Sequence, residues 1–245
     1  MDEVKNFING EYRVSSSGKT FDNINPCTGA LNGSIHEASQ EDVDAAVQAA
    51  RQALKGPWGK MTDAERGEIL HKVADGIDRR FDQFLAAECA DTGKPYNIAN
   101  HIDIPRGAAN FRVFADAVKN FSTEAFQMAT PDGKGAFNIA VRKPKGVIAV
   151  ISPWNLPLLL MTWKVGPALA CGNTVVVKPS EETPTTTSLL GEVMNEAGVP
   201  PGVFNVVNGF GPDSAGAFLT EHSGVDAISC SGEPRTGEIS SRAAG

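Results

Sequence analysis

The sequence is poor in the residues that build metal sites, disulfides and histidine-centred chemistry. Its 245 residues include four cysteines, four histidines and two tyrosines. The cysteines stand at positions 27, 89, 171 and 230, so no pair has the CxxC spacing of a zinc site or a thioredoxin-like site. Dispersed cysteines in a chain of this length predict reduced, mostly buried thiols in a cytoplasmic protein without a metal site.

Long runs of one charge and long apolar runs are missing as well. No basic run exceeds two residues, and 22 basic against 29 acidic residues give a net charge of −7. This balance predicts no nucleic-acid partner. The first residues, 1–5, lack the apolar stretch of a signal peptide. The most apolar region, residues 147–177, is interrupted by prolines and polar residues, so we expect no membrane span and no membrane partner.

The first 121 residues have the pattern of short strands followed by helices. Asn9-Gly10 between apolar residues predicts the turn of a β-hairpin. Ser39 and Thr62 are each followed three residues later by an acid, which predicts two helix starts of the capping-box type. The apolar stripe of the second helix continues to a stop at residues 92–95. A third helix is expected over about residues 105–120.

The second half of the chain changes to strand patterns. Apolar and polar residues alternate over 136–142, which predicts a strand with one wet face. After it, continuous apolar strands alternate with helices. The expected strands are 147–151, 174–177, 203–207 and 226–230, and the expected helices are 158–170, 183–197, 212–222 and 236–244. This order predicts an α/β fold, a Rossmann-like doubly wound parallel sheet covered on both faces.

The last helix pattern has no stop signal before Gly245. We therefore expect a truncated chain. The alternative is a natural end on a frayed helix, because chain termini often fray.

The first candidate site residue is Asn155, which follows the strand at 147–151. Open α/β sheets place ligands at the carboxyl ends of their strands. Pro153 and Pro157 fix the backbone around Asn155, so its amide is held in place. A held amide N–H can hydrogen-bond an oxyanion as its charge develops. The alternative is an Asn that caps the following helix.

The second candidate is the pair Lys178 and Glu181, which follows the next parallel strand. An acid at such a strand end accepts hydrogen bonds from adenosine ribose hydroxyls in dinucleotide-binding sheets. Lys178 is expected to reach other ribose hydroxyls or a phosphate. A carboxylate here repels a 2′-phosphate, which favours NAD over NADP. The alternative is an ordinary surface Lys and Glu in a loop.

Two glycine-bearing loops follow the last two strands, at residues 209–216 and 231–237. Glycine allows the backbone to approach a pyrophosphate, and the next helix offers free N–H groups. Neither loop has the GxGxxG spacing, so each is weak evidence alone. All four loops leave the same edge of one sheet, and this coincidence is more specific than any one of them.

Three stretches resemble the NAD(P)-dependent aldehyde dehydrogenase family. They are Pro153–Leu158, Pro167–Glu181 and Asp91–Pro95. The likeness covers the chain from Phe7 onward as the amino-terminal part of such an enzyme. Within the family, His101–Phe111 and Leu158–Lys164 are most similar to the enzymes of 2-hydroxymuconic and 2-aminomuconic semialdehyde oxidation in aromatic meta-cleavage catabolism.

The resemblance implies a role for each candidate residue. Asn155 matches the oxyanion-hole amide, and Arg106 matches an arginine that grips a substrate carboxylate, for which a planar guanidinium is well suited. The remaining matches are cofactor-binding positions: Ile151, Ser152, Pro153, Trp154, Lys178, Ser180, Glu181, Gly211, Gly232 and Glu233. For Arg106, the alternative is an arginine on a solvated helix face.

The resemblance also implies a division of the chain. Residues 1–121 match the hairpin and helical part of the cofactor domain, 122–145 match bridging and oligomerisation strands, and 146–245 match a truncated set of dinucleotide-binding βα units. The catalytic domain is missing. The family's nucleophilic cysteine, which forms a thiohemiacetal with the aldehyde, and its general-base glutamate both fall beyond Gly245. The expected partners are a small-molecule aldehyde and, in the full-length form, further copies of the protein.

One turn departs from the family pattern, and the function has two alternatives. Cys230 stands where the family has a bulky aromatic residue, which leaves a cavity if the site is buried. Cys171 is expected to pack in the core. The first alternative function is an inactive, truncated nucleotide-binding remnant. The second is a Rossmann reductase with a Tyr/Lys or His-centred site, which the positions of the two tyrosines and of His71 and His222 disfavour.

Overall fold

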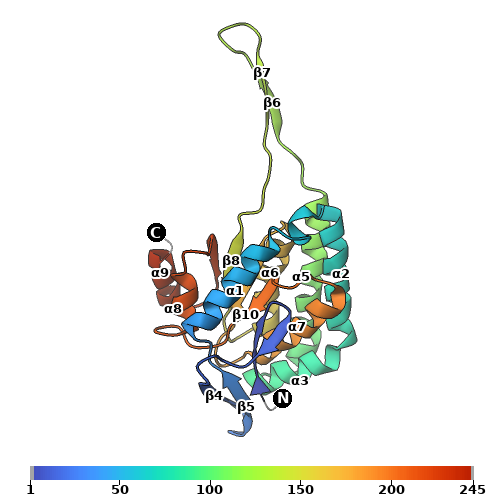
Figure 1. Ribbon diagram of the computed structural model, residues 1–245. Coiled ribbons are helices and arrows are strands. Elements are labelled where there is room, and N and C mark those ends of the chain that lie inside the picture. Colours follow the sequence, from blue (N-terminus) through green and yellow to red (C-terminus); the bar gives the residue numbers. More distant parts are fainter. Residues whose placement is uncertain (1–2, 244–245) are drawn as a thin grey trace.

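A six-stranded sheet forms the centre of the molecule in the computed structural model, which describes residues 3–243 (Figure 1). Its strand order is β11-β8-β9-β10-β2-β3. The strands are β2 (Asn6–Ile8), β3 (Glu11–Arg13), β8 (Val147–Ile151), β9 (Thr174–Lys178), β10 (Phe204–Val206) and β11 (Ala227–Cys230). The four later strands are parallel to one another, and β2 joins β10 antiparallel. The predicted parallel sheet is confirmed.

Helices cover both faces of this sheet. The helices are α1 (Gln40–Ala53), α2 (Asp63–Arg79), α3 (Phe81–Thr92), α5 (Ile104–Lys119), α6 (Pro157–Ala170), α7 (Thr185–Ala197), α8 (Ala215–Thr220) and α9 (Pro234–Ala243). Val150 of β8 packs in the larger core with α2, α3, α5, α6 and α7. Ala149, the preceding residue, packs in a second core with α1 and α8. Successive strand residues thus enter opposite cores, which is why β8 is apolar throughout.

The helix starts predicted from capping patterns are present. Ser39 and Thr62 are the N-caps of α1 and α2, and each forms a complete capping box with the acid three residues on. The expected single helix from residue 62 to 92 was wrong, because the chain breaks at Arg80 into α2 and α3. The Arg80 guanidinium forms ion pairs with Glu192 and Glu196 of α7, so a tertiary contact lies at the break.

Shorter elements complete the amino-terminal part. The Asn9-Gly10 turn joins β2 and β3 with φ values of 55° and 82°, as the predicted hairpin requires. A separate three-stranded sheet has the order β1-β5-β4. Its strands are β1 (Glu3–Val4), β4 (Thr20–Ile24) and β5 (Leu31–His36), and the short helical turns of the chain are η1 (Trp58–Lys60), α4 (Tyr96–Ile98) and the π-helical η2 (Ala99–Asp103).

A two-stranded hairpin projects from the body of the molecule (Figure 1). It consists of β6 (Ala125–Met128) and β7 (Ala136–Ile139), paired antiparallel. The apolar side chains of Phe126, Phe137 and Ile139 are exposed. The predicted strand is therefore present, but its apolar residues lie in solvent rather than in the core.

The cysteines are less buried than the sequence predicts. Cys27 and Cys171 are exposed, and Cys89 and Cys230 are partly exposed. The expectation that Cys171 packs in the core was wrong, because this residue is the C-cap of α6 and its side chain is exposed at the end of that helix. Within residues 3–243, no helix combines the length and apolar character needed to cross a bilayer.

Candidate cofactor and oxyanion site

Four loops leave the sheet at one edge, as the order of the parallel strands requires. The pairing aligns Ile151 of β8 with Lys178 of β9 and with Cys230 of β11. Just past these ends, the Ser152 N–H donates to the Lys178 carbonyl at 3.2 Å. On the other side, the Ser231 N–H donates to the Ile151 carbonyl at 3.1 Å. The Asn155 loop, the Lys178 loop and the Ser231 turn therefore start next to one another.

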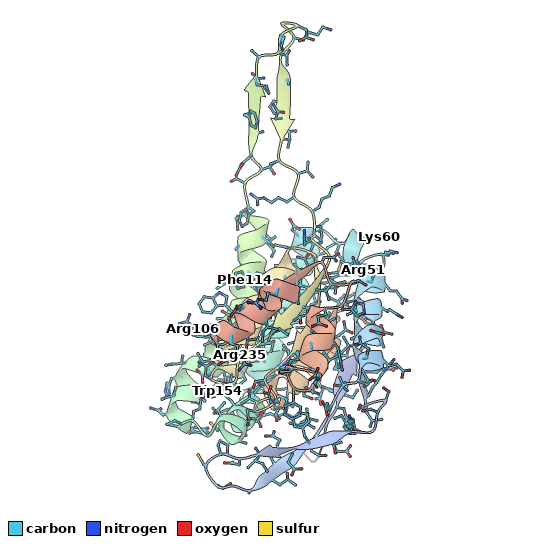
Figure 2. The ribbon with its side chains drawn as sticks, turned by 90° about the vertical axis from the view of Figure 1, so that its left-hand side faces the viewer. Arg51, Lys60, Arg106, Phe114, Trp154 and Arg235 are labelled. Atoms are coloured by element: carbon cyan, nitrogen blue, oxygen red, sulfur yellow. The ribbon has the colours of Figure 1, made fainter. Side chains whose placement is uncertain are left out.

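The Asn155 loop presents polar and aromatic side chains to solvent at this edge. Asn155 and Trp154 are exposed, and Figure 2 labels Trp154 on the body of the molecule, well away from the projecting hairpin. The N-cap of α6 is Leu156, without a side-chain cap, and Pro157 is the first helical residue. Asn155 is therefore not the helix cap that the sequence allowed as the alternative. Its backbone carbonyl accepts a 2.9 Å hydrogen bond from Lys94 Nζ.

Lys178 and Glu181 form an ion pair at the end of β9. Lys178 Nζ lies 2.9 Å from Glu181 Oε2, and Lys178 is 5% exposed. Burial alone pushes the pKa of Glu181 upward, but the charge and hydrogen bond of Lys178 more than offset it and hold that pKa below its ordinary value. The carboxylate is ionised at neutral pH and partly open to solvent. Ser180 lies between the two and is partly exposed.

The loop after β10 is held by hydrogen bonds at its own ends. Ser214 Oγ accepts from the Phe210 N–H at 3.1 Å and donates to Glu37 Oε1 at 2.6 Å. A Cβ placed on Gly209 would lie 2.9 Å from Ser214 Oγ, and the φ of Gly209 is 147°, so a side chain there is strained. Gly211 has open space around its missing Cβ.

The turn after β11 is tied to α6. Lys164 Nζ donates to Ser231 Oγ at 2.6 Å, and the next residues, Gly232 and Glu233, are exposed. Burial lowers the pKa of Lys164. Cys230 is only partly buried, so its small side chain does not meet the condition under which we expected a cavity.

Arg106 lies in the first turn of α5 and belongs to none of the four strand-end loops. Its side chain is exposed (Figure 2). Its guanidinium carbon lies 5.9 Å from the centroid of the Trp163 ring on α6. An arginine over an aromatic face is held by a cation–π attraction. The two helices are also joined by Asn110, whose side-chain amide donates to the Leu159 carbonyl at 3.0 Å.

One predicted cofactor-binding residue, Ser152, and one cluster that was not predicted are buried near the loops. Ser152 Oγ is buried and has no hydrogen-bond partner within residues 3–243. Behind the Asn155 loop, Lys94 forms ion pairs with Glu88 and Asp103, both fully buried. Lys94 and Asp103 lie in stretches on which the resemblance rests, but no spacing in the sequence links either residue to Glu88.

Comparison with known proteins assigns the chain to a family. A model described as "Aldehyde dehydrogenase family" matches residues 12–245, and the chain belongs to this family. It is 72% identical over 244 residues to the 2-hydroxymuconic semialdehyde dehydrogenase of Pseudomonas sp. (strain CF600), with 100% of this chain and 50% of that protein covered. The predicted family membership is confirmed.

More distant relatives and solved structures support the same family assignment. The 2-aminomuconic semialdehyde dehydrogenase of Homo sapiens is 41% identical over 235 residues, with 96% of this chain and 47% of that protein covered. The NAD+ complex structure of aldehyde dehydrogenase from Bacillus cereus is 40% identical and superposes with a TM-score of 0.93, covering 99% of this chain and 48% of that one. The chain spans about half the length of the curated relatives it matches.

Proposed function

We propose that this chain is the cofactor-binding half of an NAD-dependent aldehyde dehydrogenase that oxidises 2-hydroxymuconic semialdehyde to the acid. The observation that carries the proposal is the shared edge of the sheet, where Asn155, Lys178 and Glu181 lie on neighbouring loops. The substrate is suggested by the printed name of the relative from Pseudomonas sp. (strain CF600). NAD is suggested by the bound state of the Bacillus cereus enzyme.

The residues at this edge fit a dinucleotide. Ribose hydroxyls both donate and accept hydrogen bonds, and the Lys178–Glu181 pair offers one ammonium donor and one carboxylate acceptor 2.9 Å apart. The hydroxyl of Ser152, which has no partner among the described residues, and the open backbone at Gly211 add a hydrogen-bonding group and room for close approach. The Glu181 carboxylate repels a 2′-phosphate, which favours NAD over NADP. Trp154, Gly232 and Glu233 are exposed at the same edge.

Asn155 is the catalytic residue that this chain supplies. When bound, NAD accepts the hydride that leaves the substrate carbon. The Asn155 side-chain amide donates a hydrogen bond to the aldehyde oxygen as negative charge develops on it. Leu156 rather than Asn155 is the N-cap of α6, so the Asn155 side chain is not held against the end of that helix. A fixed donor stabilises the transition state without reorganising, and one such donor is typically worth about 10²–10³-fold in kcat.

Arg106 binds the substrate carboxylate in this proposal. The semialdehyde carries an acid group, and a guanidinium donates two parallel hydrogen bonds to a carboxylate. The Trp163 ring beneath Arg106 limits the directions in which the guanidinium can point. The nucleophilic cysteine and the general base are proposed to lie outside residues 1–245. The segment 122–145, which contains the projecting hairpin, is proposed to contact further copies of the protein.

The test follows NADH formation from 2-hydroxymuconic semialdehyde, using the protein expressed from its whole reading frame. We expect turnover with NAD, and a loss of kcat of roughly 10²–10³-fold in Asn155→Ala with the Kd for NAD unchanged within twofold. Glu181→Ala is the matched variant with the opposite pattern, in which NAD binds more weakly. Calorimetric titration measures both affinities.

Two outcomes contradict the proposal. One is wild-type turnover in Asn155→Ala, which removes the oxyanion role. The other is NADH production by a polypeptide of residues 1–245 alone, which places a complete catalytic set inside this chain.

A further inference from the structure

A buried ion cluster lies directly behind the Asn155 loop. Its members come from three successive segments: Glu88 from α3, Lys94 from the loop after α3, and Asp103 from the end of the π-turn η2. Both acids are 0% exposed, and the Lys94 side chain is 13% exposed. Lys94 Nζ lies 3.3 Å from Glu88 Oε1 and also bonds Asp103 Oδ2. Buried charges are expensive, so such a cluster calls for an explanation.

The cluster makes two contacts with the segment that carries Asn155. Lys94 Nζ donates a third hydrogen bond, of 2.9 Å, to the Asn155 backbone carbonyl. Glu88 Oε2 accepts from the Leu158 N–H at 3.4 Å, in the first turn of α6. These contacts lie on either side of the two residues that follow Asn155, Leu156 and Pro157. The carbonyl of Asn155 and the start of α6 are therefore both held by the same ion cluster.

A side-chain N-cap would have stabilised the start of α6 at a lower free-energy cost than buried charges do. Leu156 occupies the N-cap position with no side-chain cap, so Glu88 replaces a Ser or Asp that most helices use. The Lys94 ammonium donates to a carbonyl in an exposed loop as well as to the two acids. The cluster therefore holds the loop through its backbone, and within residues 3–243 none of its hydrogen bonds uses the Asn155 side chain.

The charges of the cluster do not balance. One ammonium faces two carboxylates, and Asp103 Oδ1 has no hydrogen-bond partner within residues 3–243. Burial, together with the neighbouring charge of Asp103, raises the pKa of Glu88 to about 7, although Lys94 opposes the shift. Glu88 therefore takes up a proton near neutral pH, which removes the excess negative charge of the cluster.

We propose that Lys94, with Glu88 and Asp103, is a positioning network that fixes the Asn155 peptide and so sets where the Asn155 amide points. The proposal rests on the oxyanion role of Asn155 stated above. Lys94 touches no reacting atom and acts through Asn155 alone. Removing the network should lower kcat and leave the binding of NAD at Lys178 and Glu181 unchanged.

The experiment is a double-mutant cycle in the protein expressed from its whole reading frame. K94M/D103N removes one positive and one negative charge together, and D91N is the matched control. Asp91 lies on α3 three residues from Glu88 and is equally a buried, hydrogen-bonded carboxylate, but its partners are Asn23 and Thr185. We expect K94M/D103N to lower kcat by 10- to 100-fold with the Kd for NAD within twofold of wild type, and D91N to keep the wild-type kcat.

The same change is then made in the Asn155→Ala background. If the network acts through Asn155, K94M/D103N lowers kcat by less than twofold more there, because the group it positions is already gone. A merely structural role instead predicts the full 10- to 100-fold loss in both backgrounds. Amide hydrogen exchange over residues 153–158 should quicken in K94M/D103N and stay unchanged in D91N.

The outcomes separate this inference from the proposed function. Wild-type kcat in Asn155→Ala removes the oxyanion role and the inference with it. A loss in Asn155→Ala with wild-type kcat in K94M/D103N overturns the inference alone, as does a full additive loss in the double background. If K94M/D103N does not fold, Lys94→Gln takes its place, because its neutral side chain is one bond shorter and still offers the acids an amide donor.

Discussion

Replacing Glu88 by glutamine should stabilise the protein at alkaline pH. Glu88 is fully buried and its pKa is raised to about 7 by burial and by the charge of Asp103. The folded protein therefore holds a proton on Glu88 that the unfolded chain releases near pH 4.5, the ordinary value for this carboxyl. Between these two values the native state binds more protons than the unfolded state, so stability falls as the pH rises.

The size of the effect follows from the shift. A difference of about 2.5 pKa units, at about 1.4 kcal/mol per unit, corresponds to roughly 3 kcal/mol lost between about pH 4.5 and 7. The loss is complete above pH 7, where both states are ionised. Glu88→Gln resembles the protonated form at every pH and keeps the Lys94–Asp103 pair. It should therefore lack this part of the pH dependence and exceed wild-type stability at pH 8.5 by up to that amount.

The assay is urea unfolding followed by tryptophan fluorescence at pH 5.5, 7 and 8.5. Glu65→Gln serves as the control of opposite sign, because hydrogen bonds from Thr62 hold the pKa of Glu65 below its ordinary value. Its charge stabilises the fold above the unfolded pKa, and that contribution is lost as the pH falls through the folded one. Glu65→Gln should thus lower stability at neutral pH. If Glu88→Gln is less stable than wild type at pH 8.5, the burial argument is refuted.

Three further substitutions test other parts of the structure. Trp58→Phe removes the 2.9 Å hydrogen bond from the indole N–H to the Asn173 carbonyl and leaves that buried oxygen unpaired. The free energy of unfolding in urea should therefore fall by about 1–3 kcal/mol. No loss would mean that water replaces the bond. Gly93→Ala places a Cβ 2.9 Å from two atoms of the neighbouring loop at a φ of 68°, so the melting temperature should fall by several degrees, and an unchanged value contradicts the strain argument. Tyr12→Phe removes the 2.5 Å hydrogen bond from the Tyr12 hydroxyl to the Ser188 carbonyl, which should lower the free energy of unfolding by about 1 kcal/mol. It should also abolish a tyrosine absorbance change near pH 12, because burial raises the pKa of Tyr12 to about 12.

The parts of the fold that depend on local signals could be predicted from the sequence. Unbroken apolar runs gave the inner strands β8 and β9, because both faces of a covered parallel sheet are buried. The Ser39 capping box gave the start of α1. The break at Arg80 could not be seen, since the apolar stripe continues almost in phase across it and the ion pairs that accompany it come from α7, more than a hundred residues away.

The candidate site likewise has parts that could be predicted from the sequence and parts that could not. The positions of Asn155 and Lys178 followed from topology, because parallel strands end at one edge. The ion cluster did not, because Glu88 and Asp103 show no spacing that links them to Lys94 or to the loop they hold. Cys171 was misjudged because its neighbour Ala170, the last residue of α6, is buried, whereas Cys171 is the C-cap that follows it and is exposed.

The β6–β7 hairpin has a consequence for the protein in dilute solution. A ribbon of two strands is marginally stable by itself in water, and this one carries Phe126, Phe137 and Ile139 on its surface. An ordered hairpin therefore needs a surface that covers these apolar side chains, whereas the central sheet is already covered by helices. Under the proposed contact of this segment with further copies of the protein, dilution should loosen this arm well before it affects the body, and proteases should cut there first.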